Sequence, residues 1–138
     1  MKLAFKVSQS TNLDYNTIKN NALSVLELKK YRLVKITDNS VQFDESPWKL
    51  MWNFEAMKRF DAGEFQINVA DGQGSVTLSY YVKLTTPLIA VAIISIFPIT
   101  DGDYYAPLFF LTFFAVSIAI NCLILKGIAA EMLNQVLS

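Results

Sequence analysis

The pattern of hydrophobic and polar positions divides the 138-residue chain into two unlike parts. Up to about residue 83, apolar residues alternate with polar ones or recur at helical spacing, which is typical of elements that bury one face. From Leu84 onward the chain is almost continuously apolar. We therefore predict an α+β head over residues 1–83 and a two-helix transmembrane hairpin over residues 84–138.

The pattern within the head predicts one helix among several strands. Thr11 and Asp14 have the spacing of a capping box, so we expect a helix to begin there and to run to about Lys30. The order β-α-β-β-β-β-β favours a mainly antiparallel sheet with one helix packed on its apolar face. The strands are expected at residues 1–7, 31–37, 40–44, 48–54, 64–70 and 75–82.

Two uncharged stretches have the length of membrane spans. The second, at about residues 104–126, reaches about 30 Å as a helix, which is the thickness of the hydrocarbon layer. The first, at about residues 84–100, is near the lower limit of about 17 residues and contains Pro87 and Pro98, so a re-entrant or interfacial segment is the alternative to a crossing. Neither stretch has the polar face of a soluble helix. A short C-terminal tail is expected after the second span.

The charges around these stretches predict an orientation. Lys83 precedes the first span and Lys126 follows the second, whereas the connection carries Asp101 and Asp103 but no Lys or Arg. By the positive-inside rule, both termini are expected in the cytoplasm, at the inner membrane if the source is bacterial. The expected product is an integral membrane protein with two spans.

A loop of the head is expected to touch the membrane surface. If the strands at residues 64–70 and 75–82 form a hairpin, the loop before the first of them lies at the membrane-facing end of the head. Basic residues near an anionic leaflet contribute about 1 kcal/mol each, and apolar neighbours can enter the interface. The alternative is a solvated loop with Phe60 folded back on the core. The predicted membrane-surface contacts are Met57, Lys58, Arg59, Phe60, Lys83 and Lys126.

A group of small and polar residues in the second span is predicted to pack against another helix. It comprises Ala115, Ser117, Ala119 and Asn121. Small side chains allow helices to approach closely in lipid, and an amide at that depth needs a hydrogen-bond partner. Packing within the hairpin is the favoured interpretation. Self-association or docking on another membrane protein is the alternative.

The composition narrows the classes of function. Twelve basic and twelve acidic residues balance, which argues against a nucleic-acid partner. Histidine is absent and Cys122 is the single cysteine, so the commonest general base and the usual zinc ligands are missing. Gly72-Gln73-Gly74 joins two strands and opens no helix, so we interpret it as a turn and not as a phosphate loop. We expect no catalytic, cofactor-binding or metal-binding residues.

These features favour a non-catalytic interaction module that presents an α+β domain at the cytoplasmic face of a membrane. The first alternative is an accessory subunit that assembles into a membrane protein complex through its hairpin. The second is an enzyme at the membrane surface, which would need ionisable groups that converge in a pocket. The expected partners are the lipid bilayer and, in the first alternative, another membrane protein or a second copy of the chain.

Overall fold

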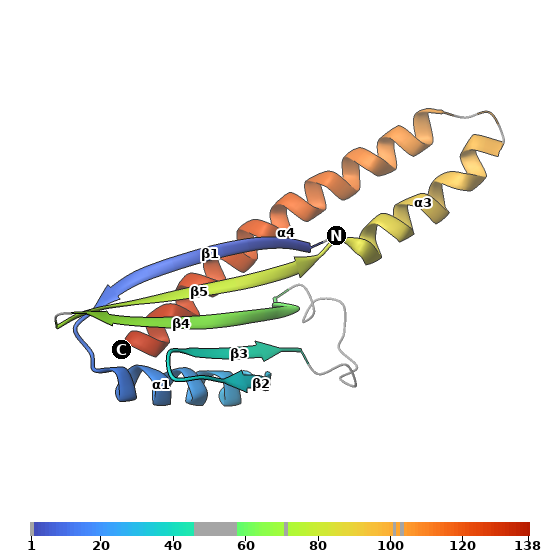
Figure 1. Cartoon of the computed structure of the whole chain (residues 1–138). Helices are drawn as coiled ribbons and strands as arrows, with labels where there is room; N and C mark the ends of the chain where they lie inside the picture. Colours follow the sequence, from blue (N-terminus) through green and yellow to red (C-terminus); the bar gives the residue numbers. More distant parts are fainter. Residues whose placement is uncertain (1, 46–57, 71, 101, 103) are drawn as a thin grey trace.

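The computed structural model describes residues 2–45, 58–70, 72–100, 102 and 104–138, which form an α+β head and two long helices (Figure 1). The predicted α+β class with an antiparallel sheet is confirmed. The strand predicted at residues 48–54 lies outside the described residues. The elements are β1 (Lys2–Thr11), α1 (Tyr15–Leu28), β2 (Arg32–Ile36), β3 (Ser40–Asp44), β4 (Ala62–Ala70), β5 (Gln73–Lys83), α3 (Thr85–Thr100) and α4 (Tyr105–Leu137).

The sheet brings the first and last strands of the head together. Its order is β1-β5-β4-β3-β2, and every pair of neighbours is antiparallel. Consecutive strands form the hairpins β2–β3 and β4–β5, the latter with Gly72 at a φ of +78°, a backbone conformation that suits glycine. β1 pairs with β5 along its whole length, from Lys2 opposite Lys83 to Thr11 opposite Gly74. Both hairpins and this closing pair leave one apolar face on the sheet.

Helix α1 packs its predicted apolar face on that side of the sheet. Ile18, Ala22 and Leu26 are fully buried, as the helical spacing predicts. The predicted start of the helix at Thr11 is wrong, because β1 extends through Thr11. Asp14 is the N-cap instead, and its carboxylate accepts a hydrogen bond from the Thr17 backbone N–H at 3.2 Å.

A second helix, α4, completes the core of the head. The sequence analysis predicts a short tail in this place and only one helix packed on the sheet. Helix α4 runs without a break for 33 residues, or about 50 Å, and its last third lies beside α1 and β1. Residues of the expected tail are therefore core residues. The predicted boundary is wrong because the helical stripe continues directly from the apolar span. The buried positions on α4 are Leu125, Ala129, Met132, Leu133 and Val136.

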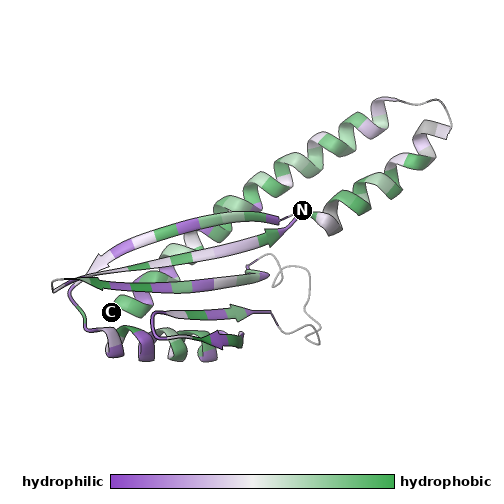
Figure 2. Ribbon diagram, viewed as in Figure 1, coloured by the Kyte–Doolittle hydropathy of each residue, from purple (hydrophilic) through white to green (hydrophobic). Residues whose placement is uncertain are grey.

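The distribution of hydropathy separates the head from the projecting helices (Figure 2). The strands alternate between hydrophilic and hydrophobic positions, whereas α3 and the first part of α4 are hydrophobic along most of their length. Helix α3 follows β5 almost directly, because Leu84 is the single residue between them. The head and the hairpin thus meet at one end of the sheet.

Candidate functional site

The most unusual surface of the molecule is the pair of helices that projects from the head (Figures 1 and 2). α3 and the first part of α4 lie side by side and carry exposed apolar side chains on both helices. Soluble proteins rarely expose contiguous apolar patches larger than a few hundred Å². The large exposed residues are Leu88, Ile89, Ile93, Ile94 and Ile96 on α3, and Leu108, Phe109, Leu111, Phe113, Val116, Ile120, Leu123 and Ile124 on α4.

The length of these helices supports one candidate span. Among the described residues, α4 is the one helix that is long and apolar enough to cross a membrane by length and composition. α3 has 16 residues, which is just below the range of about 17–25 for a spanning helix. The coarse prediction of an apolar, membrane-sized helix is therefore supported for the second stretch. The prediction of two spans is not supported, because α3 is shorter than the range for a membrane-spanning helix.

Hydroxyl groups on the first part of α4 are satisfied within the helix itself. Thr112 Oγ1 donates to the Leu108 carbonyl at 2.9 Å, and Ser117 Oγ donates to the Phe113 carbonyl at 2.9 Å. Such bonds to the preceding turn mean that neither the Thr112 nor the Ser117 hydroxyl needs water as a partner. This part of α4 is therefore compatible with an environment that offers no hydrogen bonds.

The predicted packing group on α4 divides between two sides of the helix. Ser117 and Asn121 are half-buried, whereas Ala115 and Ala119 are exposed. Residues two positions apart on a helix do not share a face, while residues four apart do. The two pairs therefore lie on different faces of α4, and the packing of this group against another helix stays a prediction. The Oδ1 atom of Asn121 is buried and has no hydrogen-bond partner among the described residues.

The predicted membrane contact of Phe60 is also wrong, because its side chain is 0% exposed. Its ring lies 4.5 Å from the Tyr80 ring, centroid to centroid, and its backbone N–H donates to the Tyr31 hydroxyl at 3.1 Å. Burial raises the pKa of Tyr31, which keeps this hydroxyl protonated. Phe60 therefore stabilises the core, as the alternative interpretation of this loop expects. Met57 lies outside the described residues.

Arg59 is occupied by contacts inside the head. Its Nε donates to Glu45 Oε1 at 2.6 Å, and its other nitrogens donate to the carbonyls of Lys29 at 2.6 Å and Lys30 at 3.2 Å. The guanidinium lies 4.2 Å from the centre of the Tyr31 ring. It thus satisfies carbonyls at the end of α1 that have no helical partner. The predicted membrane contact of Arg59 is wrong, because all of these contacts hold the side chain against the head.

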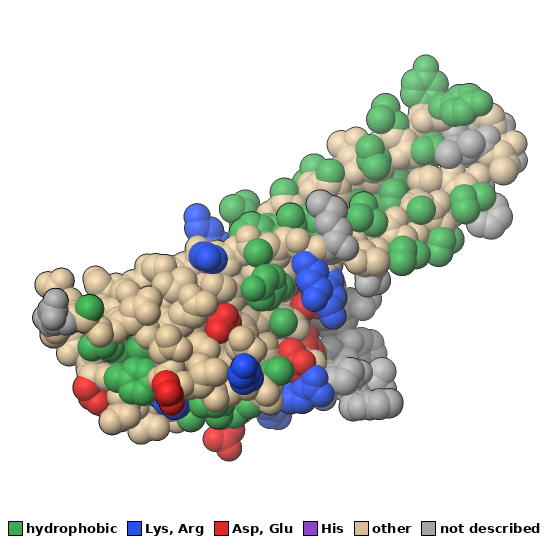
Figure 3. Space-filling view, viewed as in Figure 1, with side chains coloured by type: hydrophobic (Ala, Val, Ile, Leu, Met, Phe, Trp, Pro, Cys, Tyr) green, Lys and Arg blue, Asp and Glu red, His purple; other side chains and the backbone are tan. Residues whose placement is uncertain are grey.

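Basic side chains remain exposed at the end of the head that meets the hairpin. Lys58, Lys83 and Lys126 are exposed, as their predicted role requires. The pairing of β1 with β5 adds Lys2, whose Cα is the direct partner of that of Lys83. The sequence analysis missed Lys2, since a pairing between distant strands leaves no local signal. Figure 3 shows blue side chains near the junction of head and helices.

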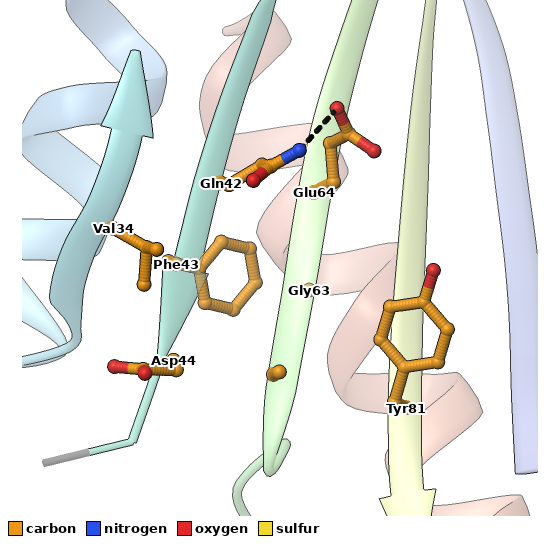
Figure 4. A pocket seen from close by; sticks show the side chains of 8 residues that line it. Val34, Gln42, Phe43, Asp44, Gly63, Glu64 and Tyr81 are labelled. Atoms are coloured by element: carbon orange, nitrogen blue, oxygen red, sulfur yellow. Dashed lines mark hydrogen bonds between the residues drawn. The ribbon is translucent and has the colours of Figure 1, made fainter. Parts of the chain in front are cut away.

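The open face of the sheet carries a shallow hollow of about 310 Å³ (Figure 4). Its polar groups are bonded to each other: Gln42 Nε2 donates to Glu64 Oε1 at 3.2 Å, and Arg32 Nε donates to Asp44 Oδ1 at 2.8 Å. The hydrogen bond from Arg32 lowers the pKa of Asp44 and keeps it ionised. The hollow is lined by Val34, Gln42, Phe43, Asp44, Ala62, Gly63, Glu64 and Tyr81.

No group of three or more His, Cys, Asp or Glu residues that could hold a metal ion occurs within the described ranges. A second hollow, of about 630 Å³, lies between the start of α1 and the end of β4. It is lined by Tyr15, Asn39, Ile67, Asn68, Val69 and Ala70, of which Tyr15 alone is titratable.

Comparison with known proteins gives no family for this chain. No family model matches it, and no curated protein matches it. Among solved structures, the chain is similar to "Crystal structure of Ara h 8.0201", with 7% sequence identity and a TM-score of 0.31 over 81% of this chain and 99% of that chain. A likeness of that size carries no argument about function.

Proposed function

We propose that the protein is an integral membrane protein whose α3–α4 hairpin anchors the head at the cytoplasmic face, where the head acts as a non-catalytic interaction module. The observation that carries this proposal is the exposed apolar surface of the two helices. Five large apolar side chains on α3 and eight on α4 would otherwise face water, which the hydrophobic effect opposes. Lipid is the solvent that removes this cost.

Both helices cross in this proposal. α3 rises about 24 Å over its 16 residues, and a bilayer thins locally around a short span at modest cost. Tyr104 and Tyr105 are exposed at the start of α4, where aromatic residues favour the membrane–water interface. The acidic connection then lies on the outer side, and Lys83 and Lys126 lie on the inner side.

The connections favour a head with a fixed orientation. One residue separates β5 from α3, and α4 passes directly into the core of the head. A domain on a flexible linker would sample many orientations, whereas two such short connections restrict its tilt. The polar open face of the sheet, which includes Gln66, Thr77 and Tyr81, is then presented in a constant position for a partner.

The test uses the full chain in membranes. We expect it to resist extraction by alkaline carbonate. In a Cys122→Ser background, an impermeant maleimide should label Tyr104→Cys in intact cells and Asn68→Cys only after the cells are permeabilised. Extraction into the carbonate supernatant would overturn the anchoring. Labelling of Asn68→Cys from outside would overturn the orientation.

A second candidate function is an accessory subunit that assembles through the hairpin. It is favoured by Ala115 and Ala119, which lie exposed one turn apart on α4 and would allow another helix to approach closely. An Ala115→Leu/Ala119→Leu variant should then lose its partner in crosslinking experiments, whereas Val116→Leu should keep it. Unchanged crosslinking in both variants would reject the accessory role and leave the interaction module.

A further inference from the structure

The membrane-facing end of the head is where basic residues collect. The register of the sheet places the start of β1, β2 and β4 and the end of β3 and β5 at this one end. α1 also ends there, because it runs back from the far end of β1 to the start of β2. Among the described residues, the basic ones at this end are Lys2, Lys29, Lys30, Arg32, Lys58, Arg59, Lys83 and Lys126, and the acidic ones are Glu27, Asp44, Glu45 and Asp61.

Three of the described acidic residues at this end, Asp44, Glu45 and Asp61, are already bonded. Arg32 binds Asp44 and Arg59 binds Glu45. The Oδ2 atom of Asp61 accepts a hydrogen bond from the backbone N–H of Lys83 at 2.7 Å. The basic side chains at this end therefore outnumber the acidic ones. The lysines without an acidic partner need another counter-ion.

Lys2 and Lys83 concentrate this excess at one point. They are direct cross-strand partners, and like charges directly opposite each other destabilise an antiparallel pair. Both side chains are exposed, and neither has an ion pair with a described residue. An anion between the two ammonium groups would convert this repulsion into attraction.

The positions of these lysines indicate that lipid headgroup phosphates are the anions within reach. Lys83 lies two residues before α3, and Lys126 lies on the exposed side of α4 close to where that helix enters the core at Leu125. In the anchored orientation, the ends of the two apolar stretches place these lysines near the boundary between the hydrocarbon and the phosphates of the lipid headgroups.

We propose that Lys2, Lys83 and Lys126 form a basic collar that selects anionic phospholipids, through their phosphate headgroups, in the leaflet that faces the head. The inference rests on the proposed membrane anchoring and adds the class of lipid to it. Each lysine near an anionic surface changes binding roughly fivefold.

Electron spin resonance on the full chain in phosphatidylcholine vesicles tests the proposal. Spin-labelled phosphatidylglycerol or phosphatidylcholine is added in trace amounts, and the motionally restricted fraction gives the relative association of each lipid with the protein. We expect the wild-type chain to prefer phosphatidylglycerol several-fold at low salt. The preference should decrease as salt is added, because salt screens exposed charges.

Matched variants locate the effect. Lys2→Gln/Lys83→Gln should reduce the preference for phosphatidylglycerol by at least half. Lys6→Gln/Lys35→Gln removes the same charge, with Lys6 about 13 Å from Lys2 along β1, and at about 0.1 M salt, where the Debye length is about 10 Å, it should change the preference much less than the first variant does. Millimolar inorganic phosphate should not compete, since the collar takes its phosphate from the bilayer.

The outcomes separate this proposal from the anchoring on which it rests. Equal association of the two lipids, with a clear restricted fraction for both, would overturn the collar and leave the anchor intact. Competition by free phosphate, or an equal loss of preference in the two double variants, would also overturn the collar. A spectrum without any restricted lipid would overturn the anchoring itself.

Discussion

The side-chain amide of Asn21 donates a hydrogen bond to the backbone carbonyl of Val136 at 2.9 Å. Val136 lies in the last turn of α4, where carbonyls have no partner within the helix. The bond therefore caps the end of the longest helix with a residue of α1, 115 positions away in the sequence. Met132 and Leu133, buried beside it, make the end of α4 an integral part of the head.

Substitution of a buried residue of α4 should destabilise the head. Leu133 is 1% exposed, and Leu133→Ala would leave a cavity at a cost of about 2–5 kcal/mol. Asn134→Ala, at the exposed neighbouring position, should change the free energy of unfolding by less than about 0.5 kcal/mol. Urea denaturation of the full chain in detergent, followed by the circular dichroism of the sheet, measures both. Equal midpoints for the two variants would contradict the packing of α4 in the core.

Two glycines should respond in opposite ways to alanine. A Cβ at Gly63 would lie 2.5 Å from Cζ of Phe43 and 2.9 Å from the Ser79 carbonyl oxygen, and the buried Phe43 ring has little room to move. We expect Gly63→Ala to destabilise by about 1–3 kcal/mol. Gly127, within α4, has no heavy atom within 4 Å of such a Cβ. Gly127→Ala should stabilise by about 0.5–1 kcal/mol, because alanine loses less backbone entropy in a helix. Thermal denaturation in detergent gives the sign of each change, and a stabilised Gly63→Ala variant would refute this packing.

Local patterns in the sequence sufficed for most of the head. The pattern located the strands that the structure describes, and the helical spacing of Ile18, Ala22 and Leu26 identified the buried face of α1. The pairing of β1 with β5 could not be predicted in this way, because it joins residues that are 63 to 81 positions apart. The end of α4 was missed for another reason. The stripe from Leu125 to Val136 has an ordinary amphipathic spacing, but the apolar run before it hides where lipid exposure ends and core packing begins.

Residue type and position beside an apolar stretch were the only signals for the predicted membrane-surface contacts. Lys83 and Lys126 flank apolar stretches and are exposed, as that position requires. Arg59 and Phe60 have the same residue types as a membrane-contacting loop, but the Tyr31 ring and the end of α1 hold them against the head. Those partners are 28 to 30 positions distant in the sequence, so residue type alone could not distinguish a core contact from a lipid contact.

The two ion pairs of the head should differ in their contribution to stability. Arg59 is largely buried and bonds Glu45 together with two helix-terminal carbonyls, so Arg59→Ala leaves several partners unsatisfied. We expect it to lower the free energy of unfolding by about 2–3 kcal/mol. Arg32 is 55% exposed in its pair with Asp44, and Arg32→Ala should cost less than about 1 kcal/mol. Denaturant titrations of the two variants compare them directly. A larger effect at Arg32 than at Arg59 would contradict these roles.

Two carboxylates should make the head less stable in acid. Hydrogen bonds from Thr17 lower the pKa of Asp14 below its ordinary value of 3.8, and a hydrogen bond from Arg32 lowers that of Asp44. The unfolded chain therefore binds more protons than the folded one in this range, so stability increases with pH there. The contribution is complete above about pH 4 and is lost as the pH falls through the pKa values of the folded state. Denaturation of the wild-type chain and of Asp14→Asn/Asp44→Asn from about pH 2.5 to pH 6 measures it, since asparagine keeps the N-cap but cannot titrate. The double variant should show the flatter profile, and two identical profiles would show that neither carboxylate is linked to folding.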